Sequence, residues 1–281
     1  MPELTSEFFD PLMERESLEA HDYCASAHVQ HLRKFENVYL IDFLKLPLKS
    51  TENYETALEI VLDSKLKEYC SLFHVLMPGD YPSQFHPRKI IFNLLKQYLS
   101  QNSTASPLLS IIPMIGPLHI DLNSDEDLVL NYIPLLKQIY EAVFKGKKLA
   151  NHPKPWRIQF ILEIVYGGWT LIRRTVKTVF HNCKDMQYGT LLNFLDNYCP
   201  LILTSYNILF KTNKFHAYFS SIIRIWIMMY SFRRHHYNKV LLIWLSFIKY
   251  WENNETTQDI YNTFANHLNI IDESTVEYVH S

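Results

Sequence analysis

Two apolar runs in the first half of the chain each end in polar side chains that could take part in chemistry. The run LFHVLM is followed by Pro-Gly and Asp80, and the run LLSIIPMIGPL is followed by His119, Asp121 and Asn123. Buried strands often hold functional groups at their far ends, where loops carry binding and catalytic residues. A histidine beside a carboxylate at such an end could assist a metal ion or a phosphate.

Each of these polar residues also has a purely structural interpretation, which we favour. Asp80 stands in a Pro-Gly-Asp-Tyr-Pro turn, where an Asp carboxylate bonds to its own backbone. His119 fits a half-buried histidine at a strand end. The acidic run from Asp125 to Asp127 resembles a metal site, but Ser124 before it could cap a helix. Acids in a first helical turn complement the helix dipole.

The segments that would position these residues indicate a sheet with helices packed on it. VYLIDFL, residues 38–44, is typical of a strand, and a helix capped by Ser50 or Thr51 follows it. LFHVLM predicts a second strand, RKIIFNLLKQYLS a second helix, and SIIPMIGPLHIDLN a third strand. Strands and helices that alternate in this way predict an α/β layer.

The second half of the chain has a different pattern and a clear break. From Ser124 to about residue 268 the apolar spacing is helical almost without interruption. The basic, proline-containing segment 145–156, KGKKLANHPKPW, is where we place a domain boundary. The predicted organisation is a flexible arm over 1–35, an α/β core over 36–144, a helical domain over 156–268 and a C-terminal segment over 269–281.

Composition excludes several classes of protein. Glycine is scarce, with 6 among 281 residues, which argues against a glycine-rich phosphate loop. The four cysteines show neither a CxxC pair nor metal-ligand spacing, which is typical of reduced thiols in an intracellular protein. The most apolar stretch, residues 220–232, contains Arg224 and is too short to span a bilayer. We expect a soluble protein of the nucleus or cytoplasm, with no membrane partner.

Short clusters of cations stand beside Trp and Tyr at 145–148, 173–174 and 233–236. Such mixtures can follow a phosphate backbone and stack bases, so DNA is a candidate partner. Cations at a helix C-terminus can equally bind the last carbonyl groups of that helix. The candidate nucleic-acid-binding residues are Lys147, Lys148, Arg233 and Arg234.

Several segments together carry a resemblance to a known family. MPGDYPSQF, IIPMIGPLHIDLN, PWRIQFILEIVYGGWTLIR and DESTVEYVHS resemble segments of a multicopy, uncharacterised fungal family that we take to be transposon-derived. This resemblance spans the chain from about residue 38 to the end. The GD loop followed by IP-x-x-G-x-LH-x-x-LN is also similar to domesticated transposases with a ribonuclease-H-like core.

The resemblance implies a fold, a chemistry and a set of residues. Asp80 looks like the second acidic position of a ribonuclease-H-like site and Glu277 like the third, and together they would hold Mg²⁺ for phosphodiester chemistry. No convincing first-strand Asp is present. We therefore expect an incomplete ribonuclease-H-like core followed by a large all-α insertion domain, with a truncated C-terminal segment. Mg²⁺ would matter only if some activity is retained.

Two functions remain open from the sequence. The first is a degenerate transposase-derived protein, without catalytic activity, that retains contact with nucleic acid. The alternative is a non-enzymatic helical domain that binds a partner protein of unknown identity. Three clustered carboxylates at strand ends would favour the first, and an exposed apolar groove on the helical part would favour the second.

Overall fold

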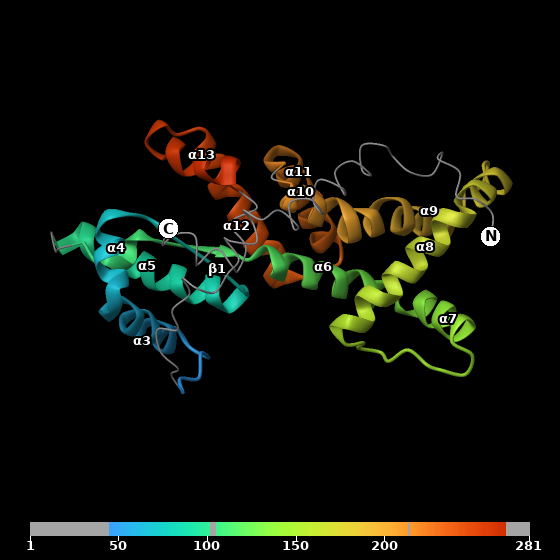
Figure 1. The fold of residues 1–281 in the computed structure, drawn as a ribbon, viewed down its shortest axis with the longest axis horizontal. Coiled ribbons are helices and arrows are strands. Elements are labelled where there is room, and N and C mark those ends of the chain that lie inside the picture. The colour runs from blue at the N-terminus through green and yellow to red at the C-terminus, as the bar shows by residue number, and fades with distance from the viewer. Residues whose placement is uncertain (1–44, 102–104, 213, 268–281) are drawn as a thin grey trace, which may run out of the picture. The chain divides into compact units, whose positions relative to one another are not determined.

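The computed structural model describes residues 45–101, 105–212 and 214–267, and these residues are mostly helical (Figure 1). Contacts divide the chain into two compact units. The sheet unit comprises, among the described residues, 45–120 and 239–262, and the helical unit comprises 121–238 and 263–267. No helix in the described part of the chain combines the length and the apolar character needed to cross a membrane.

The sheet unit is built around two parallel strands. β1 (Val75–Gly79) pairs with β2 (Ile111–Ile115), with Val75 opposite Ile111 and Gly79 opposite Ile115. The crossover between them contains α5 (Tyr81–Gln101) and the short 3₁₀ helix η4 (Pro107–Ser110). A parallel pair needs such a crossover, because its two strands run in the same direction.

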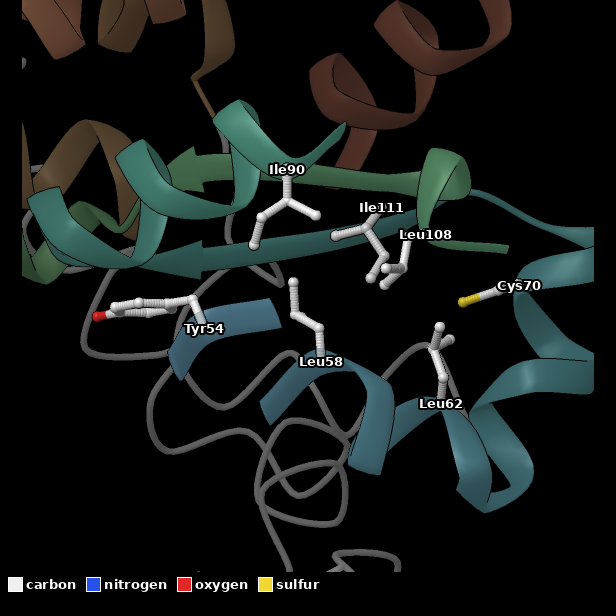
Figure 2. Packing of buried hydrophobic residues seen from close by; sticks show 7 residues of the cluster. All are labelled: Tyr54, Leu58, Leu62, Cys70, Ile90, Leu108 and Ile111. Carbon is white, nitrogen blue, oxygen red and sulfur yellow. The ribbon is translucent and has the colours of Figure 1, made fainter. Parts of the chain in front are cut away.

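A second helical layer covers the sheet. α3 (Thr51–Val61) begins at Ser50, whose side chain accepts a hydrogen bond from the Asn53 amide. The π-helical turn η3 (Leu62–Leu66) links it to α4 (Lys67–Leu72). Apolar side chains four residues apart form one face of α3, and this face packs towards α5 and β2 (Figure 2). The cluster consists of Tyr54, Leu58, Leu62, Cys70, Ile90, Leu108 and Ile111.

The helical unit contains most of the remaining elements. The first are α6 (Pro117–Asn131), α7 (Ile133–Val143), α8 (Pro155–Val179) and α9 (Met186–Asn193). The π-helical segments η5 (Phe194–Tyr198) and η6 (Leu201–Tyr206), α10 (Asn207–Lys211) and α11 (Phe215–Ser231) follow. Three further elements follow, α12 (His235–Glu252), η7 (Glu255–Thr257) and α13 (Gln258–His267), and these lie wholly or partly in the sheet unit. The divisions between the units fall inside α6, inside α12 and inside α13.

Aromatic rings hold the interior of the helical unit. Tyr132 stacks on Phe194 with ring centroids 4.1 Å apart, and the hydroxyl groups of Tyr206 and Tyr218 share a hydrogen bond of 3.0 Å. α8 buries one face through residues three or four positions apart, as the helical period requires. These residues are Ile158, Ile161, Leu162, Val165 and Trp169.

The predicted ribonuclease-H-like sheet core is wrong. Among the described residues the strands are β1 and β2 alone, and the remaining elements are helical. The strand predicted over 38–44 lies outside the described residues. The physical reason is visible after β2, because the apolar run that looked like one long strand ends at Gly116 and continues as α6 from Pro117. The predicted domain limits stay predictions, and the segments 1–35 and 269–281 also lie outside the described residues.

Candidate functional site

Asp80 caps a helix. Its carboxylate oxygen Oδ1 accepts a hydrogen bond of 2.9 Å from the Ser83 amide, and its carbonyl accepts one of 3.1 Å from the Gln84 amide. Gly79 makes this tight exit from β1 possible, because a Cβ atom there would lie 2.7 Å from the Cβ atom of Ser83. The carboxylate predicted to hold a metal is therefore bonded to a backbone amide at the N-terminus of α5. This agrees with the interpretation of Asp80 as a turn residue that bonds to nearby backbone.

His119 follows the neighbouring strand end. The Gly116 amide donates a hydrogen bond of 2.8 Å to the Gly79 carbonyl, so the two strands end side by side. His119 lies half-buried in the first turn of α6, just after that contact. Within the part of the chain that the structure describes, no group of three or more His, Cys, Asp and Glu side chains is arranged to hold a metal ion. Glu277 lies outside the described residues.

The acidic run lies in the middle of α6. The helix begins at Pro117, so Ser124 does not cap it and the following acids are not in its first turn. The dipole interpretation of Asp125, Glu126 and Asp127 is therefore wrong. Ser124, Asp125 and Asp127 are buried instead, and each carboxylate must be accounted for by its tertiary surroundings.

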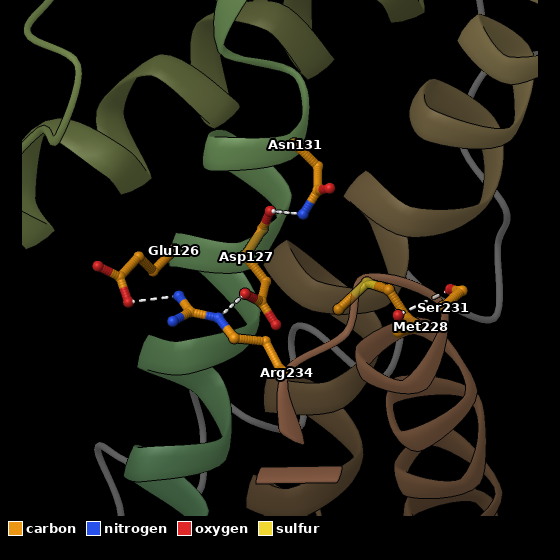
Figure 3. Close-up of polar contacts among 6 residues, drawn as sticks. All are labelled: Glu126, Asp127, Asn131, Met228, Ser231 and Arg234. Carbon is orange, nitrogen blue, oxygen red and sulfur yellow. Dashed lines mark hydrogen bonds and ion pairs between the residues drawn. The ribbon is translucent and has the colours of Figure 1, made fainter. Parts of the chain in front are cut away.

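Arg234 satisfies two of these acids (Figure 3). Its Nε atom donates to Oδ1 of Asp127, and its Nη2 atom lies 2.6 Å from Oε2 of Glu126. The Asp127 side chain is only 3% exposed, so the guanidinium compensates a buried charge. The predicted nucleic-acid contact of Arg234 thus competes with an internal ion pair that joins the start of α12 to α6.

The neighbouring Arg233 is exposed and forms the turn between α11 and α12. Its backbone has φ 61°, the left-handed conformation that commonly ends a helix. The amides of Arg233 and Arg234 donate to the carbonyls of Tyr230 and Met229, at 3.2 and 3.0 Å. This pair therefore ends α11, and the Arg233 side chain is exposed whereas that of Arg234 is partly buried.

Arg173 is likewise engaged with a carboxylate. Its Nε atom lies 2.8 Å from Asp196, which also pairs with Lys177 at 2.7 Å and accepts a hydrogen bond of 2.8 Å from Trp169. Burial would raise the pKa of Asp196, but the hydrogen bonds from Lys177 and Trp169 and the Arg173 charge lower it below its ordinary value. The charged groups of this cluster hold α8 to η5.

Lys147 and Lys148 lie on an exposed segment between α7 and α8, which we call the basic connection (residues 145–157). Gly146 makes its turn with φ 76°, the Lys147 amide donates to the Phe144 carbonyl at 2.8 Å, and Leu149 is buried. Four lysine side chains of this segment are exposed, and none pairs with a carboxylate of the described residues. They are Lys145, Lys147, Lys148 and Lys154.

Aromatic rings accompany these cations. The indole of Trp156 is 66% exposed, and the Lys154 ammonium lies 5.2 Å from its ring centroid. The Arg157 guanidinium lies 5.7 Å from the Tyr140 ring and 5.9 Å from the Phe160 ring. The basic connection thus presents cations and an open aromatic face together, which are the elements of a phosphate- and base-binding surface.

Two carboxyl groups inside the helical unit were not foreseen as a pair. Burial raises the pKa of Asp125, and together with the negative charges of Asp121 and Glu163 it brings this pKa to about 8. Burial also raises the pKa of Asp121 to about 6, although a hydrogen bond from Asn207 and the Lys211 charge oppose this. The sequence signal that could have revealed this pair is the spacing of Asp121 and Asp125, which lie one helical turn apart among apolar residues.

Asp125 borders a cleft of about 180 Å³. The cleft lies between α6 and the start of α8, and its lining combines apolar and acidic side chains. The lining residues are Leu122, Asn123, Asp125, Glu126, Pro153, Pro155 and Ile158. Oδ1 of Asp125 is buried and has no hydrogen-bond partner in the described part of the chain.

Comparisons with protein-family models, with curated proteins and with solved structures find no match to this chain. The resemblance to transposon-derived proteins therefore stays a prediction, and the functional argument rests on the geometry described above.

Proposed function

We propose that this chain is a non-catalytic nucleic-acid-binding protein of transposon-derived origin, and that the basic connection is its contact surface. The origin rests on the sequence resemblance alone. The contact rests on one observation, which is that four exposed lysines of one short segment have no carboxylate partner among the described residues, and that one of them, Lys154, lies over the exposed Trp156 ring.

The charge distribution supports this contact surface. Residues 145–157 hold five Lys and Arg and no Asp or Glu, whereas the whole chain has a formal charge of −2. A local excess of this kind attracts phosphates even when the global charge does not. The turn at Gly146 and the buried Leu149 fix the backbone, so that binding would order mainly the lysine side chains.

The proposal includes no catalytic step. A two-metal nuclease site needs about three converging carboxylates, because the two divalent ions repel each other. The Asp80 carboxylate accepts a hydrogen bond from the N-terminus of α5 instead. We expect no Mg²⁺-dependent strand cleavage, and cleavage that disappears in an Asp80→Ala variant would contradict this.

The test of the contact surface is a salt titration of binding to a labelled oligonucleotide, followed by fluorescence anisotropy. We expect Lys147→Glu/Lys148→Glu to weaken binding and to reduce the slope of log affinity against log salt by about 2, since each phosphate contact contributes about 0.9 for duplex DNA. The control is Lys96→Glu/Lys239→Glu, which makes the same charge change at exposed lysines of α5 and α12. Equal losses in both double variants would reject the basic connection as the contact surface.

A second candidate function, a helical protein-interaction domain, is favoured by apolar side chains on the outer face of α8. Leu171 is 62% exposed and the adjacent Ile172 is also exposed. Exposed apolar side chains that gather on one face often mark protein contacts. A photo-crosslinking residue at position 171 should then give one defined adduct in cells that is absent when the probe is placed at position 163. Adducts of similar yield at both positions would remove the support for this candidate.

A further inference from the structure

The cleft beside Asp125 has a size and a lining that suit a small organic ligand. Its volume is about 180 Å³, and an apolar protein cavity of about 150 Å³ is large enough to hold benzene. Pro153, Pro155 and Ile158 form an apolar wall at the start of α8, and Leu122 adds a further apolar side chain from α6. The polar part of the lining comes from Asn123, Asp125 and Glu126 of α6.

Asp125 is the polar group of this cleft that lacks a partner. Asp125 is 8% exposed, and its Oδ1 atom is buried without a hydrogen-bond partner among the described residues. Buried polar groups of native proteins are nearly always paired, so a nearly buried carboxyl group that lines a cleft and lacks a partner among the described residues is a candidate ligand-binding group. Glu126 differs, because Arg234 already binds it.

The charges that face Asp125 decide which donor suits the cleft. Asp121 from the same helix and Glu163 from α8 both act on Asp125 with negative charge, and the Cys199 thiol after η5 interacts with it electrostatically. Lys154, which stands between the two prolines of the wall, holds its ammonium over the Trp156 ring instead. The surroundings therefore disfavour an anionic ligand and favour a cationic donor.

We propose that this cleft binds a small organic cation, an ammonium or guanidinium group carried on a short apolar chain, with the Asp125 carboxylate as its counter-ion. The apolar chain would lie against Pro153, Pro155 and Ile158, and the cationic head would pair with the Asp125 carboxyl group, which belongs to the lining of the cleft. Charge-assisted hydrogen bonds of this kind are stronger than neutral ones. The inference does not depend on the nucleic-acid contact, because the basic connection contributes only apolar side chains to the cleft.

Binding of a cation should release a proton. The pKa of Asp125 is about 8 because the carboxyl group is buried and Asp121 and Glu163 face it. Without a ligand, the Asp125 carboxyl group is therefore mostly protonated at pH 6. The ammonium pairs with the carboxylate form, so the carboxyl proton passes to the buffer as the ion pair forms. The affinity should therefore rise by up to about tenfold per pH unit between pH 6 and pH 8.

The test is calorimetric titration of the full chain with n-butylammonium chloride, at pH 6 and pH 8, in HEPES and in phosphate. The two buffers differ in ionisation enthalpy, so the difference in heat counts the protons released. We expect saturable binding that is at least tenfold tighter at pH 8, with about one proton released at pH 6. The neutral isostere 1-butanol should bind far more weakly, because it cannot pair with a carboxylate.

Two variants complete the design. Asp125→Asn keeps the shape of the side chain but removes the charge, and it should abolish butylammonium binding at both pH values. Asp185→Asn is the matched control, because Asp185 is an exposed cap of α9 and asparagine caps a helix equally well. No saturable binding to the unaltered chain at pH 8, equal binding of 1-butanol, or unchanged binding in Asp125→Asn would each overturn the proposal.

Discussion

The buried carboxyl of Asp125 makes the stability of the helical unit depend on pH in an unusual direction. Burial, together with Asp121 and Glu163, raises its pKa from the ordinary 3.8 to about 8 in the folded protein. The folded state therefore binds more protons than the unfolded state between these two values. Stability from this group is greatest below about pH 4 and is lost as pH rises towards 8, the opposite of a salt-bridged carboxylate.

The magnitude follows from the two pKa values. One pKa unit corresponds to about 1.4 kcal/mol, so the free energy of unfolding should fall by about 1.4 kcal/mol per pH unit between roughly pH 5 and pH 7. At pH 7 the buried carboxyl costs about 4 kcal/mol relative to an aspartate with an ordinary pKa. Asp121, with a pKa of about 6, adds a smaller dependence in the same direction at lower pH. Asp125→Asn should remove the larger part of this pH dependence of the free energy of unfolding.

Urea denaturation followed by circular dichroism checks this at pH 5, 6, 7 and 8. We expect Asp125→Asn to raise the free energy of unfolding at pH 7 by up to about 4 kcal/mol, and by less than about 2 kcal/mol at pH 5. Asp185→Asn should leave both the value and its pH dependence unchanged, because Asp185 is an exposed helix cap. A free energy of unfolding that stays level or rises from pH 5 to pH 7 in the unaltered chain would refute the reasoning.

Three further changes test other parts of the fold. Arg234→Met should lower the free energy of unfolding by about 3–5 kcal/mol, because it leaves the Asp127 carboxylate buried without its cation, and a loss below 1 kcal/mol in urea titrations would contradict the buried pair. Arg233→Gly should raise the melting temperature, with a gain of up to about 1 kcal/mol, because glycine adopts the left-handed conformation without strain; a lower melting temperature would count against that backbone geometry. Ile111→Ala should cost about 2–5 kcal/mol by removing a buried side chain of β2, as measured by chemical denaturation, and a neutral effect would mean that the core of the sheet unit is misplaced.

The elements of the sheet unit were predictable where the signal is local. The sequence predicts a strand in LFHVLM and another in SIIPMIGPLHIDLN, and the structure has β1 in the first segment and β2 at the beginning of the second. It also predicts a helix capped by Ser50 or Thr51, and Ser50 is the cap. Short apolar runs and capping residues carry this information within about ten residues, so no tertiary context is needed.

The start of α6 was not predictable in the same way. The residues PLHIDLN continue an apolar strand without a change of composition, and the usual sign of a helix start appears later, at Ser124. The structure ends the strand at Ile115 and starts the helix at Pro117, whose fixed φ angle suits a first helical turn. The close approach of Gly116 to Gly79 decides this point, and Gly79 lies far away in sequence.

The candidate site shows the same division between local and long-range information. The lysines of the basic connection were foreseen because neighbours in sequence stay neighbours on an exposed segment. The ion pairs of Arg234 could not be foreseen, because its partners Glu126 and Asp127 lie more than a hundred residues earlier. A cluster of cations in a sequence therefore indicates a phosphate contact only where the segment is too exposed for carboxylates to reach it. On a helix packed against acidic residues, the same cations more often form internal ion pairs. Arg234 forms such pairs, whereas Lys147 and Lys148 are exposed and pair with no carboxylate of the described residues.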